Sequence, residues 1–520
     1  MGLASIRVVI LGSISFLLFW ILAVFPAFKL LPIGRTAGAL AGAVLTVMFN
    51  VETPTQAYGA IDLSILGLLF GTMMVSVYLE KADMFRYLAY ALSWRSQGGK
   101  DLLCRVCVLS AISSALFTND TCCLVLTQFL LKLCRQKSLP PKPFLLALAT
   151  SANIGSVATP IGNPQNLVIA VQSGIPFGRF FQGLLAPMLL GVVINTMLLL
   201  MTYWNHLSSV DDLTQLDMNS SSIVKEKLTA TPWTPFHSGT LFVQEEILDG
   251  EAFKSQFRNI DFAEDLESVT QVLQANASTF HKVLHSETLQ APLLPAFDFK
   301  LLNKEPSRLT LSARSTPKWQ RRLWKFCVYF VTALMLTALL YGLDMSWTAL
   351  TAAVALMALD FGDAGPLLEK VSYPLLVFFG GMFISVDGFN KTGIPSTFWD
   401  AVEPYARTTN MLGALFLTLV VIVLSNVASN VPTVLLLGSR VAASAVQSGE
   451  SESRAWLMLA WASTVGGNLT LVGSAANIIV SEQAAKAKSL GYDLTFFSHL
   501  LFGFPSTVII AAAGLLLIRG

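Results

Sequence analysis

Charged residues are scarce in this chain. Only 13% of its 520 residues are Asp, Glu, Lys or Arg, and its formal net charge is +2, whereas an average soluble domain contains about 25% charged residues. So small a net charge does not favour binding to nucleic acid. Because 54% of the residues are also hydrophobic, the composition excludes an ordinary soluble protein.

The sequence also lacks recognisable cysteine motifs and nucleotide-binding motifs. The six cysteines lie in or beside apolar segments and have neither the spacing of a metal site nor that of a redox motif. No Walker-type loop occurs, so we do not expect this chain to hydrolyse ATP. The sequence therefore predicts no enzyme, no cofactor and no resident metal.

Long apolar runs are what the sequence does contain. VVILGSISFLLFWILAVF near the N-terminus and VYFVTALMLTALL in the second half are two of them. A helix of about twenty residues crosses the roughly 30 Å hydrocarbon core of a bilayer. The predicted fold class is an all-α polytopic membrane protein with about ten transmembrane helices and two re-entrant hairpins.

The spans fall into two halves around a polar segment. Residues 1–204 form the first membrane half and residues 321–520 the second. Between them, residues 205–320 are rich in charged residues, Ser, Thr and Pro and have no spanning run, which is typical of a partly disordered linker. Each half contains one hairpin and one broken helix, at 102–134 and 144–172 in the first half and at 409–446 and 454–482 in the second.

The two halves resemble each other in sequence. A shift of 311 residues, without a gap, produces these matches: Asn119 with Asn430, Thr159 with Thr470, Gly162 with Gly473 and Asn166 with Asn477. Chance similarity between apolar helices would match leucines, whereas these matches fall on polar residues and glycine. The sequence therefore predicts an internal duplication.

Basic residues predict the orientation of the two halves. The loop at 50–60 has no Lys or Arg, whereas basic residues flank the first hairpin at Arg95, Lys100, Lys132 and Arg135. The positive-inside rule then places the base of this hairpin and the linker in the cytoplasm. Because each half has five spans, an odd number, the second half must be inverted. Inverted repeats with paired broken helices are typical of secondary transporters, whose substrate site lies near the midplane.

The broken helices predict where this site lies. In NIGSVATPIGNPQN (153–166), Pro160 and Pro164 each remove a backbone donor, so the helix should unwind. Freed backbone groups at membrane depth are tolerated only inside protein or beside a wet cavity. A packing kink is the alternative, but the equivalent stretch GGNLTLVGSAANII (466–479) also carries Thr, Gly and Asn, which favours a site.

The hairpin tips contain polar residues that could cap the returning helix or contact a substrate. We expect Asn119 and Asn430 to be N-caps, a role compatible with substrate contact. Further hydroxyls lie at the tips and breaks: Thr118, Thr121, Ser425, Ser429, Thr433, Thr159, Thr470 and Ser474.

Asp120 lies at the first tip, where an ionised carboxylate surrounded by hydrocarbon would cost several kcal/mol. Its equivalent under the 311-residue shift is Val431, so the turn does not require an acid. The expected role is a proton carrier that is protonated in one access state and ionised in the other. The alternative is an acid at the start of a helix, favoured by the helix dipole.

Three motifs carry a resemblance to a known family. FTNDTCC, LLALATSANIGSVATPIGNPQNLVIA and LPIGRTAGALAGAVL closely resemble the plant silicon efflux transporters of the Low-silicon-2 type, in the arsenite-permease branch of the ion transporter superfamily. The resemblance implies secondary active export of silicic acid across the plasma membrane in exchange for protons, with arsenite as a second substrate. Carried over to this chain, the family's substrate site comprises Thr118, Asn119, Asp120, Gly162, Asn163, Pro164, Asn166, Ser429, Asn430, Thr433, Gly473 and Asn477. The chain departs from a symmetric site because GSAAN replaces GNPQN in the second half.

The chemistry of the motifs agrees with a neutral substrate. Silicic acid is an uncharged tetrahedron of hydroxyls, so amides and hydroxyls can bind it without a fixed cation, and the motif pairs contain no Lys or Arg. A neutral solute gains nothing from membrane voltage, so uphill export needs a coupled ion. The expected partners are this solute, protons and membrane lipid, and a homo-oligomer stays open. The alternatives are a cation/proton antiporter, a sodium-coupled carboxylate carrier and a passive channel.

Overall fold

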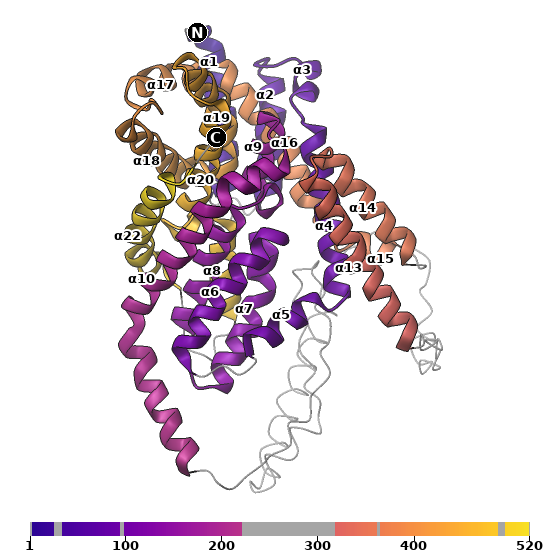
Figure 1. The fold of residues 1–520 in the computed structure, drawn as a ribbon. Helices are drawn as coiled ribbons and strands as arrows, with labels where there is room; N and C mark the ends of the chain where they lie inside the picture. Colours follow the sequence, from indigo (N-terminus) through magenta and orange to yellow (C-terminus); the bar gives the residue numbers. More distant parts are fainter. Residues whose placement is uncertain are drawn as a thin grey trace, which may run out of the picture. The chain divides into compact units, whose positions relative to one another are not determined.

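The computed structural model describes residues 3–24, 34–93, 98–220, 318–360, 364–486 and 494–518 (Figure 1). Every regular element in these ranges is a helix. Most of the predicted linker, from 221 to 317, lies outside the described residues.

The helices before the linker follow one another with short connections. They are α1 (Ile6–Val24), α2 (Gly34–Met48), α3 (Pro54–Gly59), α4 (Leu63–Lys81), α5 (Met84–Ser93), α6 (Gly99–Leu116), α7 (Asn119–Gln136), α8 (Pro141–Ser156), η1 (Pro160–Gly162), α9 (Pro164–Ser173) and α10 (Phe177–Ser220). Helix α10 continues past residue 204, where we predicted the linker to begin, because the apolar span runs on into a polar helical extension.

The helices after the linker have a similar order and similar lengths. They are α13 (Lys318–Leu340), α14 (Met345–Leu359), α15 (Gly365–Leu368), α16 (Tyr373–Lys391), α17 (Ile394–Val402), η3 (Glu403–Tyr405), α18 (Met411–Ala428), α19 (Asn430–Gln447), α20 (Glu452–Gly466), η4 (Leu471–Gly473), α21 (Ala475–Lys486) and α22 (Phe496–Leu515).

Several of these helices can cross a bilayer. Within the described residues, seven are long and apolar enough, namely α1, α4, α10, α13, α16, α18 and α22, and α2 and α14 are apolar but shorter. With its helical elements this makes the chain a polytopic membrane protein. The exact number of spans stays a prediction.

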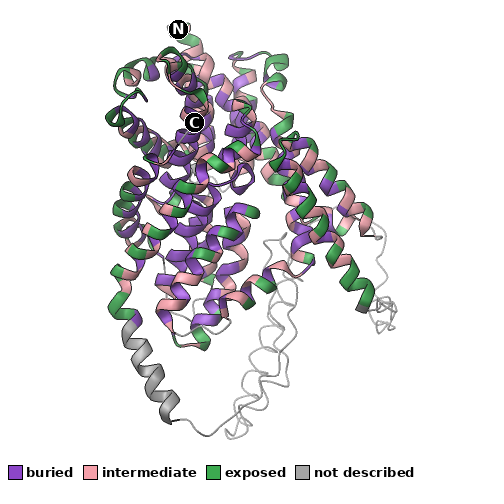
Figure 2. Cartoon of the chain, viewed as in Figure 1, coloured by how far each residue is buried: buried purple, intermediate pink, exposed green. Residues whose placement is uncertain are grey.

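The helices next to the breaks lie at the centre of the protein. Every residue from Pro143 to Ser156 of α8 and from Ala455 to Gly466 of α20 is buried (Figure 2). Helix α8 packs on α6 and α7, and α20 packs on α18 and α19. A helix that is buried on all sides cannot rearrange without disturbing its neighbours, so α8 and α20 are firm supports for the adjoining breaks.

Two ion pairs join the ends of packed helices. Lys81, the last residue of α4, lies 2.7 Å from Asp360, which follows α14. Lys391, the last residue of α16, lies 3.4 Å from Glu52, which follows α2, and 3.1 Å from Asp387. Helix α4 packs on α14 and α16 packs on α2, so both lysines tie together helices that lie on opposite sides of the linker in the sequence.

Glu52 is buried in its loop between α2 and α3, with none of its side chain exposed. Burial raises the pKa of its carboxyl from 4.5 to about 7, and the nearby Asp387 raises it further, while the charge of Lys391 partly offsets these effects. Glu52 therefore holds a proton more readily than an exposed carboxyl does.

Candidate functional site

The two hairpins turn at equivalent positions, and the residue at each has a strained backbone. Thr118 and Ser429 are the N-caps of α7 and α19, and their φ angles are +89° and +75° with extended ψ values. Such backbone angles are costly for any residue except glycine and cluster at functional sites. The prediction that Asn119 and Asn430 are the N-caps is wrong by one position, because the tip residue itself leaves the helical conformation and the asparagine opens the helix.

The asparagines at the tips have other contacts. Asn119 accepts a hydrogen bond from the Asp120 backbone N–H at 3.0 Å, and its Nδ2 donates to Asn153 Oδ1 at 2.9 Å. Asn430 Oδ1 is buried and has no hydrogen-bond partner within the described part of the chain. Asn119 thus fastens its tip to α8, whereas Asn430 keeps a free acceptor.

One asparagine side chain satisfies the carbonyls that each helix break sets free. Asn166 Nδ2 donates to the carbonyls of Ser156 at 3.0 Å, Val157 at 3.2 Å and Thr159 at 3.3 Å. Asn477 Nδ2 donates in the same way to the carbonyls of Gly467 at 2.8 Å and Thr470 at 3.1 Å. These amides replace the lost helical hydrogen bonds in a place where water is scarce.

The two breaks are also joined to each other. Asn166 Oδ1 accepts from Thr464 Oγ1 on α20 at 3.1 Å, and Asn477 Oδ1 accepts from Asn153 Nδ2 on α8 at 3.0 Å. Thr464 is the equivalent of Asn153 under the 311-residue shift. Each break therefore binds the half-helix that precedes the break of the other half, with the roles exchanged.

Asn153 is the hub of this network. Its Oδ1 accepts from Asn119 and from Ser474 Oγ at 2.9 Å, and its Nδ2 donates to Asn468 Oδ1 at 2.8 Å as well as to Asn477. One side chain on α8 thus links the first hairpin tip to the second break.

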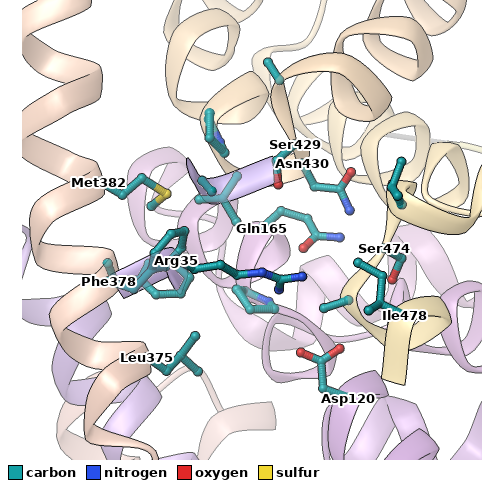
Figure 3. Close-up of a pocket in the computed structure, with 18 of the residues that line it drawn as sticks. Arg35, Asp120, Gln165, Leu375, Phe378, Met382, Ser429, Asn430, Ser474 and Ile478 are labelled. Carbon is teal, nitrogen blue, oxygen red and sulfur yellow. The ribbon is translucent and has the colours of Figure 1, made fainter. Parts of the chain in front are cut away.

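A cavity of about 320 Å³ opens where the tips and breaks meet. Seven of the predicted site residues line it: Asn119, Asp120, Pro164, Ser429, Asn430, Gly473 and Ser474. Helices α1, α2 and α16 close it with a largely apolar wall that includes Phe19, Phe378, Phe379 and Met382. Figure 3 shows Ser429, Asn430, Ser474 and Asp120 around this space.

The other predicted residues do not line the cavity, and their contact with substrate stays a prediction. Thr118 Oγ1 bonds to Thr121, and Thr433 Oγ1 donates to the Ser429 carbonyl at 2.9 Å. Ser425 is buried behind the second tip.

At the breaks, the residues outside the cavity support the backbone. Thr159 Oγ1 donates to the Ala115 carbonyl at 2.5 Å, and Thr470 Oγ1 donates to Asn426 Oδ1 at 2.7 Å. A methyl group at Gly162 would overlap the Ser156 carbonyl. The remaining three, Asn163, Asn166 and Asn477, hold the breaks through side-chain hydrogen bonds.

Sequence reasoning missed several polar residues in the cavity wall, among them Gln165 and Arg35. Gln165 lines it and donates to Thr464 Oγ1 at 3.3 Å. Arg35, in the first turn of α2, also lines it, and within the described ranges Arg35 and Asp120 are the only charged residues in the cavity wall. The signal for Arg35 was its place in the motif LPIGRTAGALAGAVL, where a lone arginine opens an apolar helix.

The cavity can hold a small polar solute by its hydroxyls. It offers acceptors at Asp120 and Asn430 and donors at Arg35 and Gln165. Across the described ranges, no group of three or more His, Cys, Asp or Glu residues is arranged to hold a metal ion.

Comparison with known proteins places the chain in a family. Residues 17–466 match the family described as citrate transporter. The chain is 48% identical to silicon efflux transporter LSI3 of Oryza sativa subsp. japonica, over 100% of this chain and 99% of that protein. It is 31% identical to the putative transporter arsB of Dictyostelium discoideum, over 94% of this chain and 87% of that protein, and 24% identical to the human P protein, over 92% and 57%. The resemblance to silicon efflux transporters is therefore confirmed, and the chain belongs to the citrate transporter family of multi-pass membrane transporters rather than to an enzyme family.

Proposed function

We propose that this protein is a secondary active exporter of silicic acid, with arsenite as a second substrate, in the plasma membrane. The observation that carries the proposal is the cavity at which two hairpin tips and two helix breaks converge, with hydroxyls, amides and one carboxylate in its wall. The 48% identity to a silicon efflux transporter over the whole chain supports the choice of substrate.

The proposed architecture has two inverted repeats, with about ten spans and two re-entrant hairpins, joined by a cytoplasmic linker at 205–320. The exchanged hydrogen bonds of the two breaks support it, since Asn166 binds Thr464 and Asn477 binds Asn153. Equivalent residues that exchange partners in this way are what a two-fold pseudosymmetric duplication produces. A site between inverted repeats is open to alternating access.

Asp120 is the proposed proton carrier of an antiport cycle. Its carboxylate lies in the cavity wall and has no hydrogen-bond or ion-pair partner among the described residues. An unpaired charge away from bulk water costs several kcal/mol, so occupancy of the site by substrate or a proton changes its energy strongly. Release of this proton to one side and its uptake from the other would drive a neutral solute uphill.

The test uses the purified full chain in sealed proteoliposomes with an imposed pH gradient. We expect uphill movement of silicic acid with the wild type and none with Asp120→Asn, which removes the proton-binding group and keeps the shape. Asp344→Asn is the matched control, because Asp344 is an exposed N-cap and asparagine caps equally well. Transport driven by sodium but not by protons, or proton-driven transport in Asp120→Asn, contradicts the mechanism.

A sodium-coupled carboxylate carrier is the second candidate. The guanidinium of Arg35 in the cavity favours it, since arginine suits a carboxylate ligand. Uptake of labelled citrate and of silicic acid by the same proteoliposomes separates the two functions. The single carboxylate in the described cavity wall argues against a cation antiporter, and uphill accumulation of silicic acid would exclude a passive channel.

A further inference from the structure

Arg35 is a charged residue that does not stabilise the helix on which it lies. It lies in the first turn of α2, where the helix dipole disfavours a positive charge. Its side chain is half-buried, and among the described residues it has no hydrogen-bond or ion-pair partner. Figure 3 shows its guanidinium extending into the cavity toward the space between Gln165 and Asp120.

The groups that face Arg35 across the cavity are acceptors without a bound donor. Asp120 presents a carboxylate, and Asn430 presents a buried Oδ1 with no hydrogen-bond partner in the described part of the chain. These two groups come from different hairpins, α6–α7 and α18–α19, and the guanidinium comes from α2. A ligand in this space would meet hydrogen-bond donors on one side and acceptors on the other.

We propose that Arg35 is a substrate-binding residue that donates hydrogen bonds to an oxygen of a small hydroxylated acid, while the hydroxyls of the same molecule donate to Asp120 and Asn430. This inference rests on the proposed function and adds how the solute is recognised. A neutral polyhydroxylated acid satisfies the whole cavity because each of its hydroxyls can both donate and accept. An inorganic cation could not accept from Arg35, and a fully ionised anion could not donate to Asp120.

The test measures how the rate of silicic acid transport depends on its concentration, in proteoliposomes that contain the full-length protein and a fixed pH gradient. The variants are Arg35→Gln, which keeps an amide donor without the charge, and Arg35→Lys, which keeps the charge without the planar fork. The matched control is Arg454→Gln, because Arg454 on α20 pairs with Glu450, which precedes that helix, and lies outside the cavity.

We expect Arg35→Gln to raise KM about tenfold or more, since a hydrogen bond to a charged group is lost. The maximal rate should change much less, and Arg454→Gln should keep the wild-type KM. An unchanged KM with a lower maximal rate in Arg35→Gln overturns the inference, because Arg35 would then act on the transport step alone.

Two further measurements separate the remaining outcomes. If Arg35→Gln does not fold, Arg35→Lys replaces it, and a raised KM in that variant supports the inference whereas a wild-type KM overturns it. If the wild type carries citrate but no silicic acid, the proposed function fails, and binding of a hydroxylated neutral acid by Arg35 fails with it. If the wild type carries silicic acid and both Arg35 variants keep its KM, the proposed function stands and only the role of Arg35 falls.

Discussion

Replacement of Asn153 by alanine should destabilise the protein more than the loss of any ordinary buried asparagine. Asn153 is 1% exposed and makes four side-chain hydrogen bonds at 2.8–3.0 Å. Three of the partner groups form their hydrogen bond within the described residues with Asn153 alone. They are Asn119 Nδ2, Asn468 Oδ1 and Asn477 Oδ1. Alanine would leave all three buried and unpaired.

The magnitude follows from the cost of stranded polar groups. Each buried group left without a partner costs about 1 to 3 kcal/mol, so three of them give a loss of about 3 to 9 kcal/mol, and partial re-pairing of the neighbours puts the expected loss near the lower end. Asn195→Ala is the matched control. Asn195 is equally buried, but its Nδ2 donates only to the hydroxyls of Thr150 and Ser151, which can turn to other acceptors. We expect a loss of about 1 kcal/mol there.

The assay is thermal unfolding of the two purified variants in the same detergent. Because membrane proteins often unfold irreversibly, the half-life of the folded state at one fixed temperature should be measured as well. The expected order of stability is wild type, Asn195→Ala and then Asn153→Ala. An Asn153→Ala variant as stable as Asn195→Ala would refute the reasoning, because the network would then not hold the tip and the break together.

Two further predictions concern strain and buried charge. Ser429→Gly should stabilise the protein by about 1 kcal/mol, because glycine removes the strain of the positive φ and Ser429 makes no side-chain cap hydrogen bond. Thr118→Gly should stabilise it less, because the Thr118 side chain accepts a hydrogen bond from the Thr121 N–H and that bond would be lost. Thermal unfolding checks both, and a destabilised Ser429→Gly contradicts the strain argument. Glu52 has a folded-state pKa of about 7, above its ordinary value of 4.5, so its stabilising contribution is complete below about pH 4.5 and is lost as the pH rises through 7. Glu52→Gln should therefore flatten the fall in melting temperature between pH 5 and 8 that the wild type shows, and the exposed Glu369→Gln should leave that fall intact. The same fall in both variants would exclude Glu52 as its cause.

The sequence alone could identify the positions at which helices end inside the protein. Proline and glycine mark the first break directly, since Pro160 and Pro164 cannot continue a helix. The second break contains no proline between Gly466 and Gly473 and was inferred from its glycines and from its equivalence to the first. Proline, glycine and the internal repeat were therefore sufficient to locate both helix breaks, because a break depends on which backbone conformations the local residues allow.

The partners of the asparagines could not be read from the sequence. The contacts of Asn153 reach residues more than 300 positions away, such as Asn468 and Asn477, and no local pattern encodes such a pairing. Arg35 was missed for the same reason, because α2 enters the cavity wall from a part of the chain far from both motifs. The N-cap error at Asn119 had a different origin, since the cap preference of asparagine does not predict a tip that adopts a positive φ.

The comparison of equivalent positions separates support from chemistry in this site. Groups that hold the breaks occur in both halves, since Asn166 and Asn477 satisfy the freed carbonyls and Thr159 and Thr470 brace the chain. Three groups that line the cavity from the first half have no such counterpart, because Arg35 corresponds to Ser346, Asp120 to Val431 and Gln165 to Ala476. A common fold would demand the same residue in both copies, so these three cannot be explained by the needs of the helices. We therefore expect the part of the transport chemistry that depends on these three groups to reside in the first half, on a scaffold to which both halves contribute.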